Sequence, residues 1–384
     1  MKIIRYISAS ERINYGDLLF PIIFKKYFGD EFRFENYGLI KSDNSNFGAL
    51  KTKSFKKLSK EINHKDILVI GGGEVLFSRW SKLVSFISSF YNYIFKWKIF
   101  KKFESITNIT SYYMGGKGNY SPYVPRFKAN TYYISVGGQF NKSMTSSKRK
   151  EIKSILKKTK SLTVRDLRTF ESLRNENVEC KLIPDSAILM SKMYNMNDLK
   201  SLASIAIKDF NFPFIYLQVA VDKGPEDLHL FVDKMSKAAN DHSLKIICCP
   251  IGLASGHDDH IILKQMIDLN PDWQYIHPKN IYDIMLLIAS SKLYVGTSLH
   301  GAITAFSFGV PIVPLNKKIK KLDSFVSTWT KDVYINSIEY NQVELGVKEA
   351  LNKWDKSKGE KLLLNQQKIV ENHFEDIKVD MLDT

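Results

Sequence analysis

A histidine occupies the turn between an apolar strand and a helix of small residues, in the stretch VGTSLHGAITAFSFGVP (295–311). His300 lies between Gly296 and Gly301, where the first turn of a helix offers backbone N–H groups that suit an anion. Histidine is also the side chain whose unperturbed pKa lies nearest neutrality, so it can transfer a proton. A lone histidine is more often structural, but the small residues around this one favour a tightly packed, ligand-facing turn.

An asparagine and an aspartate follow the first expected strand, in the stretch NYGDLL (14–19). Gly16 permits a tight turn, and Asp17 stands at the head of a helical pattern. Two interpretations are open at this point. Asp17 caps the helix and does nothing more, or Asp17 and Asn14 lie at the carboxyl edge of the sheet, where α/β proteins bind ligands.

Three glycines and a glutamate follow another apolar strand, in ILVIGGGEVLF (67–77). Gly71, Gly72 and Gly73 allow the backbone to approach a ligand closely and expose its N–H groups, next to Glu74. Close packing of two backbones is the alternative explanation. The stretch has neither the Walker lysine pattern nor the GxGxxG spacing, so it is weak evidence for a nucleotide site.

An arginine ends a third strand, in LTVRDLR (162–168), and the stretch IPDS (183–186) follows. Arg165 can point a planar guanidinium into a cleft and bind a carboxylate or phosphate through two hydrogen bonds. Asp166 then either caps the next helix or orients Arg165. A surface ion pair is the common alternative, but the position at the end of a strand favours a ligand contact.

These motifs need elements that bring them to one place. Short β-branched and aromatic runs alternate with helical patterns, which is typical of βα units and a largely parallel sheet. The runs form two series, separated by a polar connection near residues 190–212. We predict an α/β protein with two Rossmann-like domains, at residues 1–195 and 196–340, and a cleft between them. The periodicity of residues 341–384 predicts C-terminal helices that pack back on the first domain.

The composition limits the class of protein. Among 384 residues, 56 Lys and Arg against 40 Asp and Glu give a net charge of +16, which favours an anionic partner. The lysines are spread along the chain without a recognised nucleic-acid-binding motif, so we expect no nucleic acid partner. Three cysteines, two of them adjacent, form a poor disulfide framework, and no uncharged apolar run reaches the ~20 residues of a bilayer span. These features predict a cytoplasmic protein.

The ordered set of motifs resembles the polysaccharide (ketal) pyruvyltransferase family. The matching motifs are the Asn-x-Gly-Asp turn, the three glycines, the Arg-Asp and Pro-Asp pairs and the His-Gly turn, which together span residues 14 to about 320. None is specific alone, but their order is. The resemblance implies a GT-B-like fold and transfer of a pyruvyl group from phosphoenolpyruvate to a sugar of a surface polysaccharide or its lipid-linked precursor, forming a cyclic ketal.

The resemblance also implies roles for several residues. His300, the backbone of Leu299, and Arg165 would contact the donor, as would a lysine at Lys320 if PIVPLNKKIKK aligns without a gap. Ketal formation needs a proton on the methylene carbon, which we assign to His300 as the acid. We assign Asp17 to activate or orient an acceptor hydroxyl. This chemistry requires neither a cofactor nor a metal.

One departure from the family pattern concerns the donor. The family commonly has Ser-x-Arg-x-His, whereas this chain has Ser298 where the arginine is expected. A fixed positive charge is therefore missing near the expected anion site. Either Arg165 and the lysines of 317–321 supply enough charge, or the donor is a nucleotide sugar and the protein is a GT-B glycosyltransferase.

Two further segments have alternative interpretations. Residues 79–103 are rich in aromatic residues and lysine, so they form either a helix on an anionic membrane surface at the inner face of the plasma membrane or a buried helix with a basic exposed end. The cluster HDDH (257–260) suggests a metal site. Consecutive helical residues point around the helix, so we expect a helix start beside the cleft instead.

Overall fold

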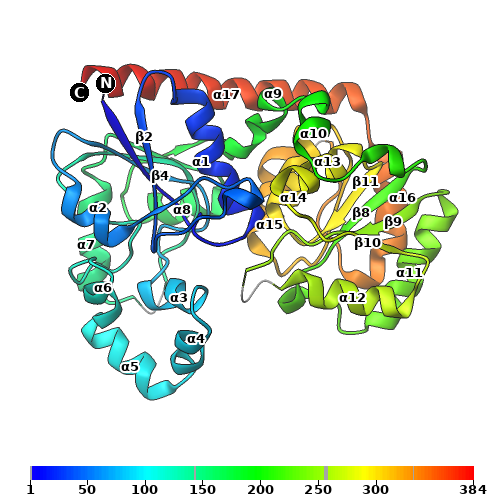
Figure 1. Cartoon of the computed structure of the whole chain (residues 1–384), viewed down its shortest axis with the longest axis horizontal. Coiled ribbons are helices and arrows are strands. Elements are labelled where there is room, and N and C mark those ends of the chain that lie inside the picture. The colour runs from blue at the N-terminus through cyan, green and yellow to red at the C-terminus, as the bar shows by residue number, and fades with distance from the viewer. Residues whose placement is uncertain (1, 142–143, 255–257, 332) are drawn as a thin grey trace.

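A computed structural model describes the chain except residues 1, 142–143, 255–257 and 332 (Figure 1). Within the described residues, two parallel sheets form the centres of two domains, one with seven strands in the order β3-β2-β1-β4-β5-β6-β7 and one with five in the order β10-β9-β8-β11-β12. In both sheets the strand order reverses beside the first strand, and such a reversal opens a crevice at the carboxyl edge. The predicted α/β fold with two Rossmann-like domains and a long C-terminal helix is confirmed.

The first domain consists of βα units and one helical excursion. Its strands are β1 (Ile3–Ile7), β2 (Arg33–Gly38), β3 (Lys53–Ser54), β4 (Ile67–Gly71), β5 (Asn130–Val136), β6 (Ser161–Val164) and β7 (Lys181–Leu182). Its main helices are α1 (Tyr15–Phe28), α2 (Phe55–Glu61), α7 (Ser146–Leu156) and α8 (Leu167–Arg174). The excursion between β4 and β5 contains α3 (Trp80–Ser85), α4 (Ser89–Phe95), α5 (Lys98–Thr107) and α6 (Ile109–Tyr113). The segment 79–103, expected to be one helix, is therefore divided among α3, α4 and the start of α5.

The second domain repeats the βα pattern around a shorter sheet. Its strands are β8 (Phe214–Gln218), β9 (Lys245–Cys248), β10 (Gln274–Tyr275), β11 (Leu293–Gly296) and β12 (Ile312–Pro314). After α9 (Met190–Met193), which ends the first domain, its helices are α10 (Met196–Leu202), α11 (Leu228–Asp241), α12 (Asp259–Leu269), α13 (Ile281–Ser290), α14 (Leu299–Ser307), α15 (Lys320–Phe325) and α16 (Val343–Lys353). The strands are almost continuously apolar because helices cover both faces of a parallel sheet.

The last helix, α17 (Lys356–Asp383), runs along both domains and brings the C-terminus next to the N-terminus (Figure 1). Its buried Phe374 packs edge-on against Phe24 of α1, at 5.8 Å between ring centroids. Farther back along the helix, the Gln366 side chain donates a hydrogen bond to the carbonyl of Trp329, in the second domain, at 2.6 Å. The helix thus links the two domains outside the cleft.

The start of α1 packs against α14 of the other domain. Tyr15 and Thr304, both fully buried, share a hydrogen bond of 2.9 Å between their hydroxyl groups. A continuous apolar core surrounds this contact and contains residues of both domains. The two helices that begin at the cleft are therefore fixed relative to each other.

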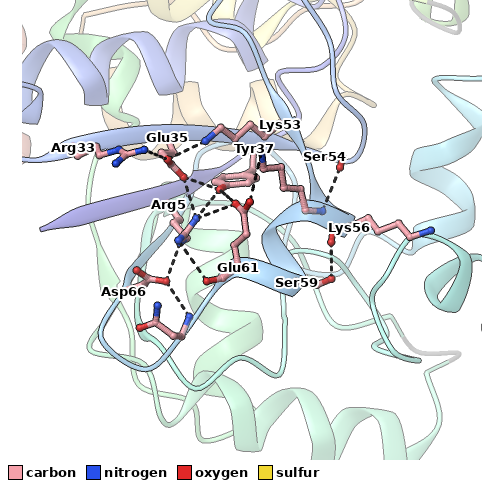
Figure 2. A network of polar contacts seen from close by, with 12 residues as sticks. Arg5, Arg33, Glu35, Tyr37, Lys53, Ser54, Lys56, Ser59, Glu61 and Asp66 are labelled. Atoms are coloured by element: carbon pink, nitrogen blue, oxygen red, sulfur yellow. Dashed lines mark hydrogen bonds and ion pairs between the residues drawn. The ribbon is translucent and has the colours of Figure 1, made fainter.

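A buried network of charged side chains ties three strands of the first sheet together (Figure 2). Arg5 of β1 contacts the carboxylates of Glu35 at 3.0 Å and Asp66 at 2.9 Å. The Tyr37 hydroxyl donates a hydrogen bond to Glu35 at 2.7 Å, and Lys53 lies 2.9 Å from the same carboxylate. Each buried carboxylate is thereby compensated by a cation, as burial of charge requires.

Candidate active site

A cavity of about 310 Å³ lies between the carboxyl ends of the two sheets. Residues from loops after strands of both domains line it, including Arg12, Asn14, Asp17, Gly73, Glu74, Arg165, Gln218, Asp259, Thr297, Ser298, His300 and Lys321. A larger hollow of about 920 Å³ lies at the opposite, amino ends of β6 and β7, and the residues that line it include none of the predicted ones. The cleft between the domains is therefore the candidate active site.

His300 is buried at the first turn of α14 and reaches the start of α1. A Cβ atom on Gly16 would lie 1.8 Å from the His300 Nδ1 atom, so only glycine allows this close approach. The imidazole also packs edge-on against Phe20, at 5.1 Å between ring centroids. Ser298 is the N-cap of α14 and accepts a hydrogen bond from the Gly301 N–H at 3.2 Å. Both helix starts therefore determine the orientation of the histidine.

We expect Gly16→Ala to misplace His300 and to lower the catalytic activity measured for this cleft by about 100-fold, since a shift of about 1 Å at a reacting group has this effect. Unfolding free energies of the single variants Gly16→Ala and His300→Ala and of the double variant test the cause. The loss caused by Gly16→Ala should shrink when His300 is already alanine, because the clashing ring is gone. An equal loss in both backgrounds would contradict the proposed contact.

Asp185 lies between Arg165 and His300. Its Oδ2 atom is 2.8 Å from Arg165 Nη1 and 3.7 Å from His300 Nε2, and all three side chains are buried. Burial raises the pKa of Asp185, but the neighbouring His300 and the positive charge of Arg165 together lower it more, so the net shift is downward. The Asp185 carboxylate is therefore the anionic neighbour shared by the guanidinium and the imidazole.

Arg165 emerges from the end of β6, as predicted. Its backbone carbonyl accepts a hydrogen bond from the Trp329 indole at 2.7 Å, and its Nη2 atom lies 3.8 Å from Glu74. Its Nε atom is buried and has no hydrogen-bond partner within the described residues. Asp166 accepts a hydrogen bond from the Thr169 N–H at 2.8 Å and is the N-cap of α8, so the orienting partner of Arg165 is Asp185.

Asp17 does not cap α1. The N-cap position belongs to Asn14, and Asp17 lies in the first turn, where its carboxylate accepts hydrogen bonds from Asn14 at 2.9 Å and Arg12 at 3.2 Å. Arg12, which the sequence reasoning missed, stacks on Phe86 with 4.9 Å between guanidinium and ring. Its Nε and Nη1 atoms are buried without a partner in the described part of the chain. Arg12 thus brings a positive charge to the cavity, whereas Ser298, at the position where an arginine was expected, brings none.

The three glycines have different roles. A Cβ atom on Gly71 would lie 1.6 Å from the Tyr6 hydroxyl, and one on Gly72 would lie 2.2 Å from the Phe20 ring, so these two glycines permit close packing. Gly73 and Glu74 line the cavity. The packing alternative thus explains the first two positions, and only the last two line the cavity.

The lysine that lines the cavity is Lys321. Lys320 is exposed at the start of α15 and is not among the lining residues, whereas the next residue turns toward the cleft. Burial lowers the pKa of Lys321, and the charge of Arg165 adds to the decrease. Of these two lysines, the structure thus brings Lys321 to the cleft.

Gln218, at the end of β8, fixes the histidine turn. Its side-chain oxygen accepts hydrogen bonds from the N–H groups of Thr297 at 3.2 Å and Ser298 at 2.9 Å. Its amide donates to Asp259 at 2.8 Å. The N–H groups of Thr297 and Ser298 are therefore occupied within the protein. Gln218 is a polar residue at the end of an apolar strand, as Arg165 is, and this position could have identified it from the sequence.

The HDDH segment begins α12 beside the cleft. Asp259 is buried, lines the cavity and accepts hydrogen bonds from the N–H groups of Ile251 at 3.1 Å and Gly252 at 2.8 Å. Burial raises the pKa of Asp259 to about 6. His257 lies outside the described residues, and among those described no group of three or more metal-ligating side chains occurs.

Solved structures with a similar fold are nucleotide-sugar enzymes. The UDP-N-acetylglucosamine 2-epimerase from Rickettsia bellii aligns with a TM-score of 0.59 at 9% identity, over 100% of this chain and 97% of that one. Anabaena Alr3699/HepE in complex with UDP-glucose gives 0.54 at 12% identity, over 100% and 99%. S. aureus MnaA with UDP gives 0.58 at 11% identity, over 96% and 90%. At these identities the likeness establishes the GT-B-like fold alone.

Sequence comparison identifies the family. No curated protein matches the chain significantly. The family model described as polysaccharide pyruvyl transferase matches residues 14–317, which include the turns that carry Asn14, Arg165 and His300. This range begins at the first motif after β1 and ends in the loop after β12, so it contains both halves of the cleft. The chain therefore belongs to the polysaccharide pyruvyl transferase family.

Proposed function

We propose that this protein transfers a pyruvyl group from phosphoenolpyruvate to a sugar of a surface polysaccharide or its lipid-linked precursor, forming a ketal. Arg12 and Arg165 carry the proposal, because both line one cavity and each has buried guanidinium N–H groups without a partner in the described chain. Phosphoenolpyruvate has a carboxylate and a phosphate, and guanidinium groups bind both kinds of anion. Lys321 adds a third cation to the same cavity.

The proposed reaction begins with a proton transfer. His300, whose Nε2 atom lies 3.7 Å from the Asp185 carboxylate, donates a proton to the methylene carbon of phosphoenolpyruvate. The carbon that bears the phosphate becomes electrophilic, and one sugar hydroxyl adds to it and loses its proton. A second hydroxyl of the same sugar then displaces the phosphate, which takes up the proton of that hydroxyl and leaves as inorganic phosphate. The products are a methyl ketal carboxylate and phosphate.

Asp17 is the proposed acceptor-side group. Its carboxylate lines the cavity and is held by Asn14 and Arg12, so it can orient an attacking hydroxyl and accept its proton. The backbone of Leu299 and the side chain of Ser298 adjoin the donor in this arrangement. With such a substrate the protein acts in the cytoplasm, at the inner face of the plasma membrane when the acceptor is lipid-linked.

Thermal unfolding with and without phosphoenolpyruvate tests the donor. At a hundredfold excess over the dissociation constant, the ligand should stabilise the protein by about 2.7 kcal/mol. Arg12→Gln and Arg165→Lys should abolish the shift, because each removes a planar group facing the cavity. Arg126→Gln, at an exposed ion pair with Glu151, is the matched control and should keep it.

The same measurement separates the two donor classes. UDP and UDP-glucose, assayed in parallel, should produce no shift that depends on Arg12 or Arg165. A shift with UDP-glucose but none with phosphoenolpyruvate would mean that Ser298 marks a changed donor. The protein would then be a GT-B glycosyltransferase that uses a nucleotide sugar.

A further inference from the structure

The helical excursion α3–α6 projects from the first domain on the side opposite α17 (Figure 1). It carries all of the strongly exposed aromatic side chains of the described chain: Phe90, Tyr93, Trp97, Phe103, Tyr112 and Tyr113. Soluble proteins rarely gather exposed apolar side chains in this way unless the surface binds something. The excursion therefore needs a partner.

The aromatic side chains are arranged along short amphipathic helices. Phe90 and Tyr93, 73% and 62% exposed, are three residues apart in α4 and so share one of its faces. Ile99 and Phe103, 85% and 48% exposed, are four residues apart in α5 and share one of its faces. Trp97, 55% exposed, joins the two helices and packs edge-on against Tyr93.

Basic residues accompany the aromatic ones. Residues 79–103 contain one arginine and five lysines, at 79, 82, 96, 98, 101 and 102, and no Asp or Glu. The four lysines at 96–102 are exposed, so they flank Trp97 and Ile99 directly. Exposed aromatic side chains surrounded by lysine fit an anionic bilayer surface, because rings enter the headgroup region and lysines meet the lipid charge.

The excursion is joined to the cleft. Lys82, Leu83 and Phe86, at the end of the first excursion helix, line the cavity that contains His300. A bilayer beneath α4 and α5 would thus lie at the entrance of the cleft. No helix in the described part of the chain combines the length and hydrophobicity that a bilayer span requires, so contact would be peripheral.

We propose that α4 and α5 dock the protein on an anionic phospholipid membrane and that the acceptor reaches the cleft from this surface while still attached to lipid. The docking follows from the exposed aromatic and lysine side chains alone. The lipid-linked acceptor additionally rests on the proposed pyruvyl transfer.

Flotation of the full-length protein with lipid vesicles tests the docking. Vesicles of phosphatidylcholine with 30% phosphatidylglycerol should bind the protein at least about tenfold better than pure phosphatidylcholine, and added salt should weaken the binding. Trp97 fluorescence should shift to shorter wavelength on binding. Lys96→Glu with Lys98→Glu, and separately Trp97→Ser, should each weaken binding about tenfold or more.

A charge-matched variant provides the control. Lys361→Glu with Lys368→Glu changes two exposed lysines of α17 and gives the same net charge as the first double variant. It should bind anionic vesicles like the unmodified protein. Equally weakened vesicle binding in both double variants would show that only net charge matters and would overturn the proposal. Equal binding to neutral and anionic vesicles would also overturn it. A dimer that Trp97→Ser dissociates would show that a second copy covers this surface instead.

The outcome is independent of the catalytic proposal. Vesicle binding requires neither donor nor acceptor, and the donor test by thermal unfolding requires no membrane. If the protein binds vesicles but phosphoenolpyruvate causes no thermal shift, the membrane-docking proposal stands and phosphoenolpyruvate is excluded as the donor. If phosphoenolpyruvate causes a thermal shift but the protein does not bind vesicles, the donor proposal stands and the membrane-bound acceptor is excluded.

Discussion

We expect His300→Gln to lower the kcat of pyruvyl transfer by about 10²- to 10⁴-fold, the range that positioned general acids contribute. Glutamine has a similar length and polarity but cannot deliver a proton to the methylene carbon. The Asp185 carboxylate, 3.7 Å from the imidazole Nε2 atom, would then have no imidazole beside it. Release of inorganic phosphate from phosphoenolpyruvate, with a panel of diol-bearing glycosides as acceptors, measures the rate.

Two readouts separate the chemical step from binding and folding. The thermal shift caused by phosphoenolpyruvate should persist in His300→Gln, because the cations Arg12, Arg165 and Lys321 are unchanged. His229→Gln, at an exposed position of α11, is the matched control and should leave kcat unchanged. A normal kcat in His300→Gln would exclude the histidine as the acid and shift attention to Asp259, whose pKa burial raises to about 6.

Replacing Arg5 with leucine should lower the free energy of unfolding by about 3–5 kcal/mol, the usual loss when one partner of a buried ion pair is removed. Arg5 compensates both Glu35 and Asp66 in the buried network of Figure 2. In the variant, Asp66 keeps a hydrogen bond from the Asn63 N–H but no cation within the described network. Urea unfolding measures the loss.

Arg33→Leu is the control for this prediction. Arg33 lies 3.1 Å from the same Glu35 carboxylate, but its side chain is 65% exposed whereas that of Arg5 is 8% exposed. Solvent screens exposed pairs, so we expect a loss of at most about 1 kcal/mol. Equal losses in the two variants would contradict the assignment of stability to burial. Transfer activity of the folded Arg5→Leu protein should be unchanged, because Arg5 does not line the cleft.

The network also gives a pH dependence. Burial opposes ionisation of Glu35, but hydrogen bonds from Lys53 and Tyr37 and the charge of Arg5 outweigh it and lower its pKa to about 2. A carboxyl group whose pKa is lower in the folded state stabilises the protein above its unfolded pKa, near 4.5. This contribution to stability should disappear as the pH falls from about 4.5 to about 2.

Much of the fold was predictable from local pattern. Continuous apolar runs such as residues 67–70 and 132–136 predicted buried parallel strands, and both lie inside β4 and β5. The strand β2, RFENYG, was missed because its polar residues hide the pattern. Glu35 is tolerated there only because Arg5 and Lys53 approach it from neighbouring strands. Such compensation depends on strand order, which periodicity does not encode.

The sequence by itself determined which motifs belong to the cleft, because parallel strands share one carboxyl edge and residues that follow them meet there. Asn14, Glu74, Arg165 and His300 were found in this way. Only the tertiary structure decided what each residue contacts. Neighbouring helical residues differ by about 100° in direction, so Lys321 and not Lys320 faces the cavity. Likewise, Gly16 accommodates His300 because two helices from different domains meet at their first turns, and no spacing along the chain specifies that contact.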